Sequence, residues 1–534
     1  MASPTGTDLL IPFQEAAIED IQPTYDRLRA SYRSGKTKNI QFRLQQLRKL
    51  YWGLTDVESV IFQSLWKDLH KCHHEAVLTE VDWCKNEILF FIKNLEKFAK
   101  DQPIDNVPAT FWAMKHRIRS EPYGTVLVIG AFNYPFMLSV LPMLGAIAAG
   151  NTVIVKPSEH APHTAMAIKK LLECVDPDCY AVLNGALPVS QAVLDLKFDK
   201  IAFTGSRAVG TIVAKKAAET LTPVLLELGG QNPGFVTKNA DVKLAARRLL
   251  WGKCSNAGQV CLSQNYAMVE RSVLNQFIAE LNAQYRIFYP SGAQKSPDFC
   301  RIINRPSFDR IKGMLDSTGG KIVMGGRTDA DDLYIEPTVV LVDDINDSMI
   351  IHESFGPIWS IVPYDDLDKA IEFVNEVDAT PLSMFAFGSD AETKKIMDCV
   401  SSGGATINDS YTHASLTVAP LGGVGASGQG NYHGKYSFKA FSHERTIAKV
   451  PAWVDKLLRV RYMPYQRSDL ERFRKMQAGS VNFDRQGNVT RGLGYWIALV
   501  LGLGGSSAKG AAVRWGILLT VAVSLGLRRK TLGL

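Results

Sequence analysis

Two short segments of this chain carry residue types suited to acyl-transfer chemistry. Cys261 ends the segment Asn256-Ala-Gly-Gln-Val-Cys261, and Glu227 opens the segment Glu227-Leu-Gly-Gly-Gln-Asn232, thirty-four residues earlier. A thiolate can attack a carbonyl carbon, and a carboxylate can activate the thiol, a water molecule, or each in turn. A lone cysteine is usually buried apolar filler, so it is the pairing of the two Gly-rich segments that indicates chemistry.

The length and composition indicate a folded protein of several domains. A chain of 534 residues exceeds what one hydrophobic core usually supports, so two or three domains are expected. The eight cysteines follow no framework spacing, which indicates reduced thiols in a cytosol-like compartment. A group formed by His70, Cys72, His73, His74 and Cys84 lacks a second ligand pair with metal-binding spacing. We interpret it as a packing or solvated feature and predict no metal.

The positive charge is concentrated at the C-terminus. Residues 491–534 contain six Lys or Arg and no Asp or Glu, out of a net charge of +7 for the whole chain. The folded part is therefore close to neutral, which argues against nucleic-acid binding, because that function usually requires a basic face on the folded domain. The first fourteen residues show no secretory signal.

The element pattern predicts two α/β blocks. Residues 8–100 have the apolar spacing of amphipathic helices, and from residue 124 the chain alternates apolar strands with helices. The strands are expected at 125–129, 152–156, 181–183, 200–203 and 224–228, with helices at 135–149 and 161–174. Near-continuous apolar strands separated by helices predict a parallel, Rossmann-like sheet covered on both faces.

The second α/β block is expected between about 230 and 430. It should contain helices at 241–253 and 367–377 and strands at 265–269 and 357–363. Residues 452–490 are basic and irregular in pattern and are interpreted as a connector.

The best candidate for a cofactor turn is the segment Ile201-Ala-Phe-Thr-Gly205-Ser206. A strand here leads into a helix that contains Gly210. Gly205 allows a ligand to approach the backbone, and Ser206 can cap the helix start, where free N–H groups favour phosphate. The run Gly423-Val-Gly-Ala-Ser-Gly428 fits the GxGxxG spacing, but no buried strand precedes it and no clear helix follows, so we reject it as the pyrophosphate site.

Besides the two catalytic segments, five motifs in family order resemble those of the NAD(P)-dependent aldehyde dehydrogenases, and the resemblance covers about residues 10–465. The two catalytic segments match, Phe203–Gly210 resembles the family's cofactor turn, and Lys156-Pro-Ser-Glu159 resembles its adenosine-ribose clamp. Phe132-Asn-Tyr-Pro135 looks like the oxyanion asparagine segment, and His352–Pro357 like the nicotinamide-ribose segment. The run Leu421–Phe438, followed by Phe441-Ser-His443, is most similar to class 3 and fatty aldehyde dehydrogenases. Phe132, Ser354 and His352 depart from commoner residues without removing a chemical group.

The resemblance implies a role for each matching residue. Cys261 would be the nucleophile and Glu227 the base that activates the hydrolytic water. The Asn133 amide, with the Cys261 N–H, would stabilise the oxyanion, worth roughly 3–4 kcal/mol per donor. The cofactor would be NAD, with NADP tolerated, and the residues expected to bind it are Lys156, Glu159, Gly205, Ser206, Gly210, Glu353 and Phe355. Cys254 is expected to be a packing residue, and Asn408 to belong to the far wall of the site or to a turn.

The predicted layout is an α/β fold with a small β oligomerisation element and an apolar C-terminal tail. Residues 1–226 would hold the N-terminal helices and the dinucleotide-binding domain, with an oligomerisation hairpin near 105–122. The catalytic domain would follow at 227–430 and the oligomerisation strand at 431–451. The connector would occupy 452–490 and a membrane-anchor tail 491–534. A homodimer is implied by the class 3 resemblance.

Two apolar runs, 495–505 and 511–527, lie in the tail, and neither reaches the ~20 residues of a clear spanning helix. A short tilted span, a hairpin in one leaflet, an interfacial helix and a soluble helical hairpin all fit this pattern. An anchored tail would leave the catalytic domain facing the cytosol, at a membrane of the endoplasmic reticulum, the outer mitochondrial surface or the peroxisome.

The sequence leaves the substrate open. The leading hypothesis is a membrane-attached dehydrogenase of long-chain fatty aldehydes, and the alternative within that class is a polyene apocarotenal. A catalytically silent membrane-tethered scaffold is a third possibility, opposed by the intact Asn133, Glu227 and Cys261.

Overall fold

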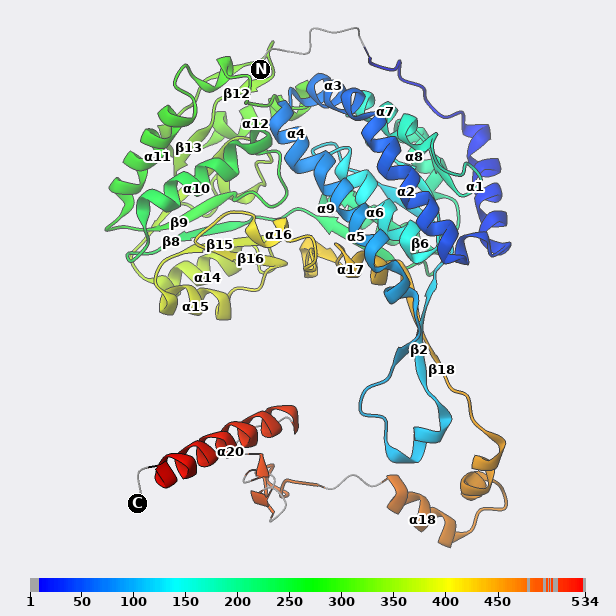
Figure 1. Ribbon diagram of the computed structural model, residues 1–534. Helices are drawn as coiled ribbons and strands as arrows, with labels where there is room; N and C mark the ends of the chain where they lie inside the picture. The colour runs from blue at the N-terminus through cyan, green and yellow to red at the C-terminus, as the bar shows by residue number, and fades with distance from the viewer. Residues whose placement is uncertain are drawn as a thin grey trace. The chain divides into compact units, whose positions relative to one another are not determined.

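A computed structural model describes residues 9–477, 481–492, 496–497, 499, 501–502 and 508–531 (Figure 1). The chain forms two compact units, one of Met1–Pro103 with Arg117–Ile447 and one of Ile104–His116 with Ala448–Leu534. The first unit holds both large sheets and all the predicted site residues.

A six-stranded sheet in the first unit has the order β17-β7-β6-β3-β4-β5. Its strands are parallel except for the last one in sequence, which is antiparallel to its neighbour. They are β3 (Thr125–Ile129), β4 (Thr152–Lys156), β5 (Tyr180–Val182), β6 (Lys200–Gly205), β7 (Val224–Leu228) and β17 (Gly428–Gln429). The predicted strand series and the Rossmann-like α/β architecture are confirmed.

Both faces of this sheet are buried. Successive side chains of a strand point to opposite faces, so each strand contributes to two core clusters. Val126, Val128 and Leu225 belong to one core cluster, whereas Leu127 and Leu226 belong to another. Helices cover the two faces: α1 (Ile18–Arg33), α2 (Ile40–Asp56), α3 (Glu58–Leu69), α5 (Asp82–Ala99), α6 (Met137–Ala149), α7 (Pro162–Leu172), α8 (Leu187–Leu194) and α9 (Arg207–Ala218). This double cover explains why the strands are apolar almost without interruption.

A seven-stranded sheet carries the second α/β block, in the order β10-β13-β14-β9-β8-β15-β16. Its strands are β8 (Pro233–Val236), β9 (Tyr266–Glu270), β10 (Lys321–Met324), β13 (Thr338–Leu341), β14 (Ile358–Tyr364), β15 (Ser383–Phe387) and β16 (Gly404–Ile407). Figure 1 shows its helices in green and yellow: α10 (Val242–Cys254), α11 (Leu274–Phe288), α12 (Arg305–Ser317), α14 (Leu367–Val377) and α15 (Asp390–Cys399). The predicted elements of this block are present.

A small sheet of β1 (Gln102–Pro103), β2 (Arg117–Pro122) and β18 (Ser442–Ile447) completes the first unit. β18 pairs antiparallel with β2, from Ser442 opposite Pro122 to Ile447 opposite Arg117. The segment between β1 and β2 belongs to the second unit.

The second unit contains two helices in the predicted connector, η7 (Ala452–Arg461) and α18 (Arg467–Gln477). This segment is therefore more regular than its sequence pattern indicates, and its role as a connector stays a prediction. Charged pairs four residues apart, such as Arg467 and Glu471, support an exposed helix.

The second tail run lies in α20 (Ala508–Thr531), and most of the first run, like residues 1–8 and 532–534, lies outside the described residues. Across the described ranges, no helix has both the length and the apolar character needed to cross a membrane.

Candidate active site

Glu227 lies near the carboxyl end of β7, on the edge where parallel sheets of this type place their ligands. Thr204 of β6 lies beside it on one side and Gly428 of β17 on the other. The side chain is buried, and its Oε1 has no hydrogen-bond partner among the described residues. Burial raises the pKa of this carboxyl well above its usual range. A carboxylate with a raised pKa is a stronger base, as proton abstraction from water requires.

Cys261 follows a strained turn at the end of α10. Asn256, Ala257 and Gly258 have φ values of 50°, 49° and 68°, three consecutive left-handed residues. Gly258 lies so close to the Gly356 carbonyl that a Cβ would collide with it. Strain of this kind persists where the surrounding structure fixes it, and it is common at active sites.

Hydrogen bonds fix this catalytic loop on both sides. The Asn256 side-chain amide donates to the Gln259 carbonyl at 3.0 Å and to the Asn133 carbonyl at 2.8 Å. Asn232, at the end of the Glu227 segment, donates to the Cys261 carbonyl at 2.7 Å. The two Gly-rich segments that the sequence pairs are therefore in direct contact.

The Cys261 thiol lies in an environment that favours its protonated form. Burial raises its pKa to about 12, with further contributions from the negative charges of Glu353 and Glu227. The backbone N–H groups of Cys261 and Leu262 act in the opposite direction. The influence of Glu227 and Glu353 on the thiol shows that the three side chains belong to one site. The thiol becomes a nucleophile only after it loses its proton.

Asn133 lies in the loop after β3 and faces the catalytic loop. Its side chain is 2% exposed, and Nδ2 donates to the Gln259 carbonyl at 3.0 Å. An amide nitrogen has two hydrogens, so one remains for an oxyanion formed at Cys261. Its role as an oxyanion donor stays a prediction, and its placement fits that role.

The turn between β6 and α9 has the features of a phosphate site. Ser206 is the N-cap of α9, and its Oγ accepts the Val209 N–H at 3.3 Å. A Cβ on Gly210 would lie 2.5 Å from the Leu228 side chain, so this glycine allows α9 to pack closely on β7. Gly205 lies at the strand end, where a ligand can approach the backbone. These residues fit a dinucleotide whose pyrophosphate lies at the helix N-terminus.

Lys156 and Glu159 form an ion pair at the end of β4, in the same sheet as the β6–α9 turn. Lys156 ends β4, and its Nζ lies 2.6 Å from Glu159 Oε2. Burial acts to raise the pKa of Glu159, but the hydrogen bond from Lys156, a backbone hydrogen bond and the nearby positive charges together outweigh burial, and the pKa is lowered. The pair holds one ammonium and one carboxylate together, and binding of the adenosine ribose by these two groups remains a prediction.

Glu353 and Phe355 follow α13 (Ser348–Ile351). A Cβ on Gly229 would lie 2.5 Å from Glu353 Oε2, so this carboxylate lies against the turn that carries Glu227. Burial raises the pKa of Glu353 to about 7. Phe355 has a φ of 44° and packs edge-on against Phe132, with ring centroids 5.7 Å apart. Binding of ribose by Glu353 remains a prediction.

Sequence reasoning missed two asparagines that hold the site together. Asn232 and Asn256 both stand inside the segments already singled out. Asn232 donates to the Cys261 carbonyl, and Asn256 donates from the catalytic loop to the Asn133 carbonyl. An amide in a Gly-rich segment is the signal that could have identified them, because a buried loop needs side chains to satisfy its backbone groups.

A thiol nucleophile, a buried carboxyl base and a dinucleotide turn define a site for oxidising a carbonyl through a covalent intermediate. Residues 1–447 match the model of the Aldehyde dehydrogenase family. The chain belongs to the aldehyde dehydrogenase family, and it is an NAD(P)-dependent enzyme that oxidises aldehydes.

Three relatives place the chain within the family. A Beta-apo-4'-carotenal oxygenase of Gibberella fujikuroi is 55% identical over 100% of this chain and 99% of its own length. The Aldehyde dehydrogenase, dimeric NADP-preferring, of Canis lupus familiaris is 41% identical over 83% of this chain and 98% of its own. A solved structure, the substrate-bound state of Staphylococcus aureus AldH, is 39% identical with a TM-score of 0.79, covering 83% of this chain and 98% of that one.

Proposed function

We propose that this enzyme oxidises a polyene aldehyde of the apocarotenal type to the corresponding acid. The observation that carries the proposal is the 55% identity to the Gibberella fujikuroi Beta-apo-4'-carotenal oxygenase, which extends over the whole chain, tail included. A Neurospora crassa relative with the same name is 51% identical over 95% of both chains. The Staphylococcus aureus relative at 42% identity is named for another polyene aldehyde, 4,4'-diaponeurosporen-aldehyde.

In the proposed mechanism, the Cys261 thiol gives its proton to a water molecule, and the sulfur forms a bond to the aldehyde carbon while the carbonyl π electrons move to the oxygen. The second Nδ2 hydrogen of Asn133 and the Cys261 N–H stabilise the resulting oxyanion, an interaction worth about 3–4 kcal/mol per donor. NAD(P), held by the residues of the β6–α9 turn and by Glu353, would supply the hydride acceptor. Collapse of the oxyanion with loss of the hydride leaves a thioester on Cys261. Glu227 then takes a proton from water, and the hydroxide adds to the thioester carbon and releases the acid and the thiol.

A saturated fatty aldehyde is the second candidate. It has the same reactive end and a rod-like apolar body, and the class 3 type of closing motif supports it. Measuring kcat/KM for NADH formation over saturated aldehydes of increasing length and over polyene aldehydes of matched length separates the two. A higher value for the polyene at matched length is expected, and equal or higher values for the saturated chain would overturn the proposal.

We also propose that α20 attaches the enzyme to a membrane surface, with the catalytic domain in the cytosol. The helix exposes seven large apolar side chains: Val513, Trp515, Ile517, Leu518, Leu519, Val521 and Val523. Burying them would contribute on the order of 7–10 kcal/mol, comparable with the ~8 kcal/mol of micromolar affinity. An interfacial helix would make the lipid-dissolved substrate available locally.

Deleting residues 491–534 tests this attachment. The truncated enzyme should move from the membrane pellet to the supernatant and keep its activity on short, soluble aldehydes. Full-length protein that stays in the supernatant after carbonate-washed fractionation would refute the attachment.

A homodimer is proposed through β18. This strand ends the order β1-β2-β18, so one of its edges has no paired strand within the described chain. Native proteins usually cover such an edge, and the canine relative is named as dimeric. Light scattering of the tail-deleted enzyme at micromolar concentration should give twice the monomer mass.

A further inference from the structure

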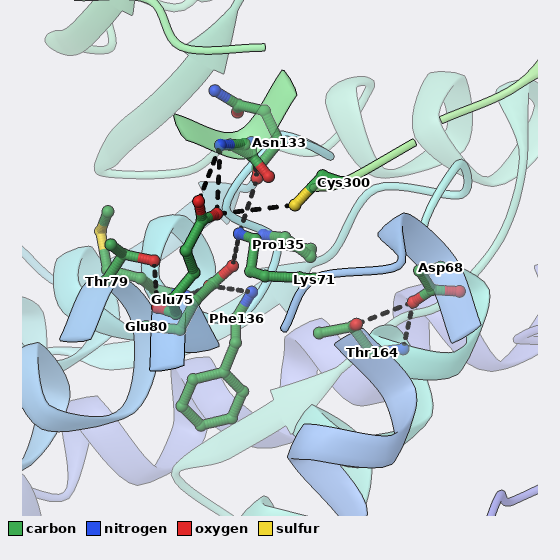
Figure 2. A network of polar contacts seen from close by, with 12 residues as sticks. Asp68, Lys71, Glu75, Thr79, Glu80, Asn133, Pro135, Phe136, Thr164 and Cys300 are labelled. Carbon is green, nitrogen blue, oxygen red and sulfur yellow. Dashed lines mark hydrogen bonds and ion pairs between the residues drawn. The ribbon is translucent and has the colours of Figure 1, made fainter. Parts of the chain in front are cut away.

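A buried cluster of charges lies behind the active site, outside the residues assigned above. Lys71, Glu75 and Glu80 come from one stretch around α4 (His73–Ala76) and η2 (Val77–Val81). Lys71 is 1% exposed and Glu80 is fully buried, and their charged atoms lie 2.5 Å apart (Figure 2). Fully buried charges are rare unless they are paired, and a buried pair is weak support for stability, so the cluster needs another explanation.

One arm of the cluster fixes the loop that carries Asn133. Lys71 Nζ donates to the Asn133 carbonyl at 3.1 Å and lies 4.1 Å from the centre of the Tyr134 ring. Glu80 accepts the N–H groups of Phe136 and Met137 at 3.1 and 2.9 Å, at the start of α6. Glu80 thus caps a helix that has no side-chain cap of its own.

The local geometry explains how Glu80 reaches this helix. It lies in the π-helical turn η2, and such turns are frequent at functional sites because the wider turn redirects a side chain.

The other arm fixes the loop that leads to Cys261. Glu75 accepts the Asn256 N–H at 3.1 Å, at the first of the left-handed residues, and the Cys300 thiol at 3.5 Å. Figure 2 shows both arms meeting around Asn133. The Asn133 carbonyl accepts from Lys71 Nζ and from the Asn256 side chain, so a single backbone oxygen joins the two loops.

We propose that Lys71, Glu75 and Glu80 are positioning residues that set the distance between the Asn133 amide and the Cys261 sulfur. The proposal rests on the oxidation described above. None of the three side chains needs to contact the aldehyde, because their effect passes through the two loops. A misplacement of about 1 Å at a reacting centre can cost on the order of a hundredfold in rate.

The test compares Lys71→Met, Glu75→Gln and the double variant Lys71→Met/Glu80→Gln with the parent enzyme. The double variant removes both partners of the Lys71–Glu80 ion pair, so Glu80 is not left as a buried charge without its partner, and the variant should fold even if Lys71→Met alone does not. The single-turnover rate of NADH formation should fall by about a hundredfold, while the KM for the cofactor changes less than threefold. The matched control is Lys85→Met/Glu58→Gln, which removes a partly exposed ion pair of 3.1 Å from the same helical region and should keep the parent rate.

A double-mutant cycle with Asn133→Ala separates positioning from a general structural role. If Lys71 acts through Asn133, then Lys71→Met should slow Asn133→Ala by less than fivefold, far less than it slows the parent. The proposal would be overturned if the rate losses of Lys71→Met and Asn133→Ala were additive. It would also be overturned if Lys71→Met/Glu80→Gln kept the single-turnover rate within threefold of the parent. Failure of all three variants to fold would do the same, because it would show that the cluster serves folding. Failure of the proposed function is distinct: the parent itself would then form no NADH.

Discussion

Replacing Glu353 by Gln tests how the charges of the site control its nucleophile. Burial holds the pKa of the Cys261 thiol at about 12, and the Glu353 carboxylate contributes to this value ahead of Glu227. The pKa of Glu353 is itself raised by burial, to about 7, so this carboxylate is mostly ionised at pH 8. Glutamine keeps the shape and removes the charge, and we expect the pKa of Cys261 to fall.

The expected magnitude follows from the thiolate fraction. A thiol with a pKa of about 12 is ionised to roughly one part in ten thousand at pH 8. Lowering its pKa by about one unit, or ~1.4 kcal/mol, increases the thiolate tenfold. A less basic thiolate is a weaker nucleophile, with a Brønsted coefficient of about 0.4–0.5, so the net alkylation rate should rise about threefold.

The difference in alkylation rate between Glu353→Gln and the parent should depend on pH. Below pH 6, Glu353 is already protonated in the parent, so the parent and Glu353→Gln should react at the same rate. The advantage of the variant should appear as the pH rises through about 7, where the parent carboxyl ionises.

The assay is iodoacetamide alkylation of the cofactor-free enzyme, with the Cys261 peptide quantified by mass spectrometry. Exposed Cys399 provides an internal reference for reagent and pH. Glu219→Gln, which removes an exposed carboxylate paired with Lys216, is the control and should leave the rate unchanged. An unchanged or slower rate for Glu353→Gln at pH 8, or an equal gain below pH 6, would refute the reasoning.

Four further outcomes are expected. Cys261→Ser should lower dehydrogenase activity by more than tenfold while NAD still binds in a fluorescence titration, since a hydroxyl is a far poorer nucleophile than a thiolate. Glu227→Gln should give a burst of NADH without turnover in stopped-flow absorbance, and a burst-free loss would place Glu227 in thiol activation instead. The kcat/KM should be higher with NAD than with NADP, because the Glu159 carboxylate repels a 2′-phosphate; an equal or better value with NADP would contradict this. Burial raises the pKa of Glu87 to about 7, so the folded parent should lose up to about 3 kcal/mol as the pH rises from about 4.5 to 7, and Glu87→Gln should not show that loss in urea melts.

The sheets and the core of the site could be predicted from the sequence because their signals are local. A parallel strand buried on both faces is a continuous apolar run, and the run at 125–129 coincides with β3. The sequence predicts that Cys261 and Glu227 share a site, because acyl transfer requires a thiol and a carboxylate together. In the structure, a hydrogen bond from Asn232 joins the two segments.

The charged cluster behind the site could not be predicted in the same way. Lys71 and Glu80 look like ordinary charges in a helical segment, and their partners stand sixty-two and fifty-six residues away at Asn133 and Phe136. Helical periodicity assigns such charges to solvent, because it carries no information about a loop that arrives from another part of the chain. The π-helical turn that directs Glu80 inward is equally invisible to a pattern based on 3.6 residues per turn.

The glycines at 423–428 have the GxGxxG spacing of a phosphate-binding turn, but they have a different role in this structure. Gly428 begins β17 and lies opposite Glu227, antiparallel to β7. Its φ of 154° and its closeness to the Leu226 carbonyl exclude a side chain, and a Cβ on Gly423 would collide with the Ser427 backbone. These glycines therefore allow a second backbone to pair with the edge of β7 opposite Glu227, whose carboxyl has a pKa raised by burial. The spacing that resembles a phosphate loop here brings a strand against the edge of β7, which carries Glu227.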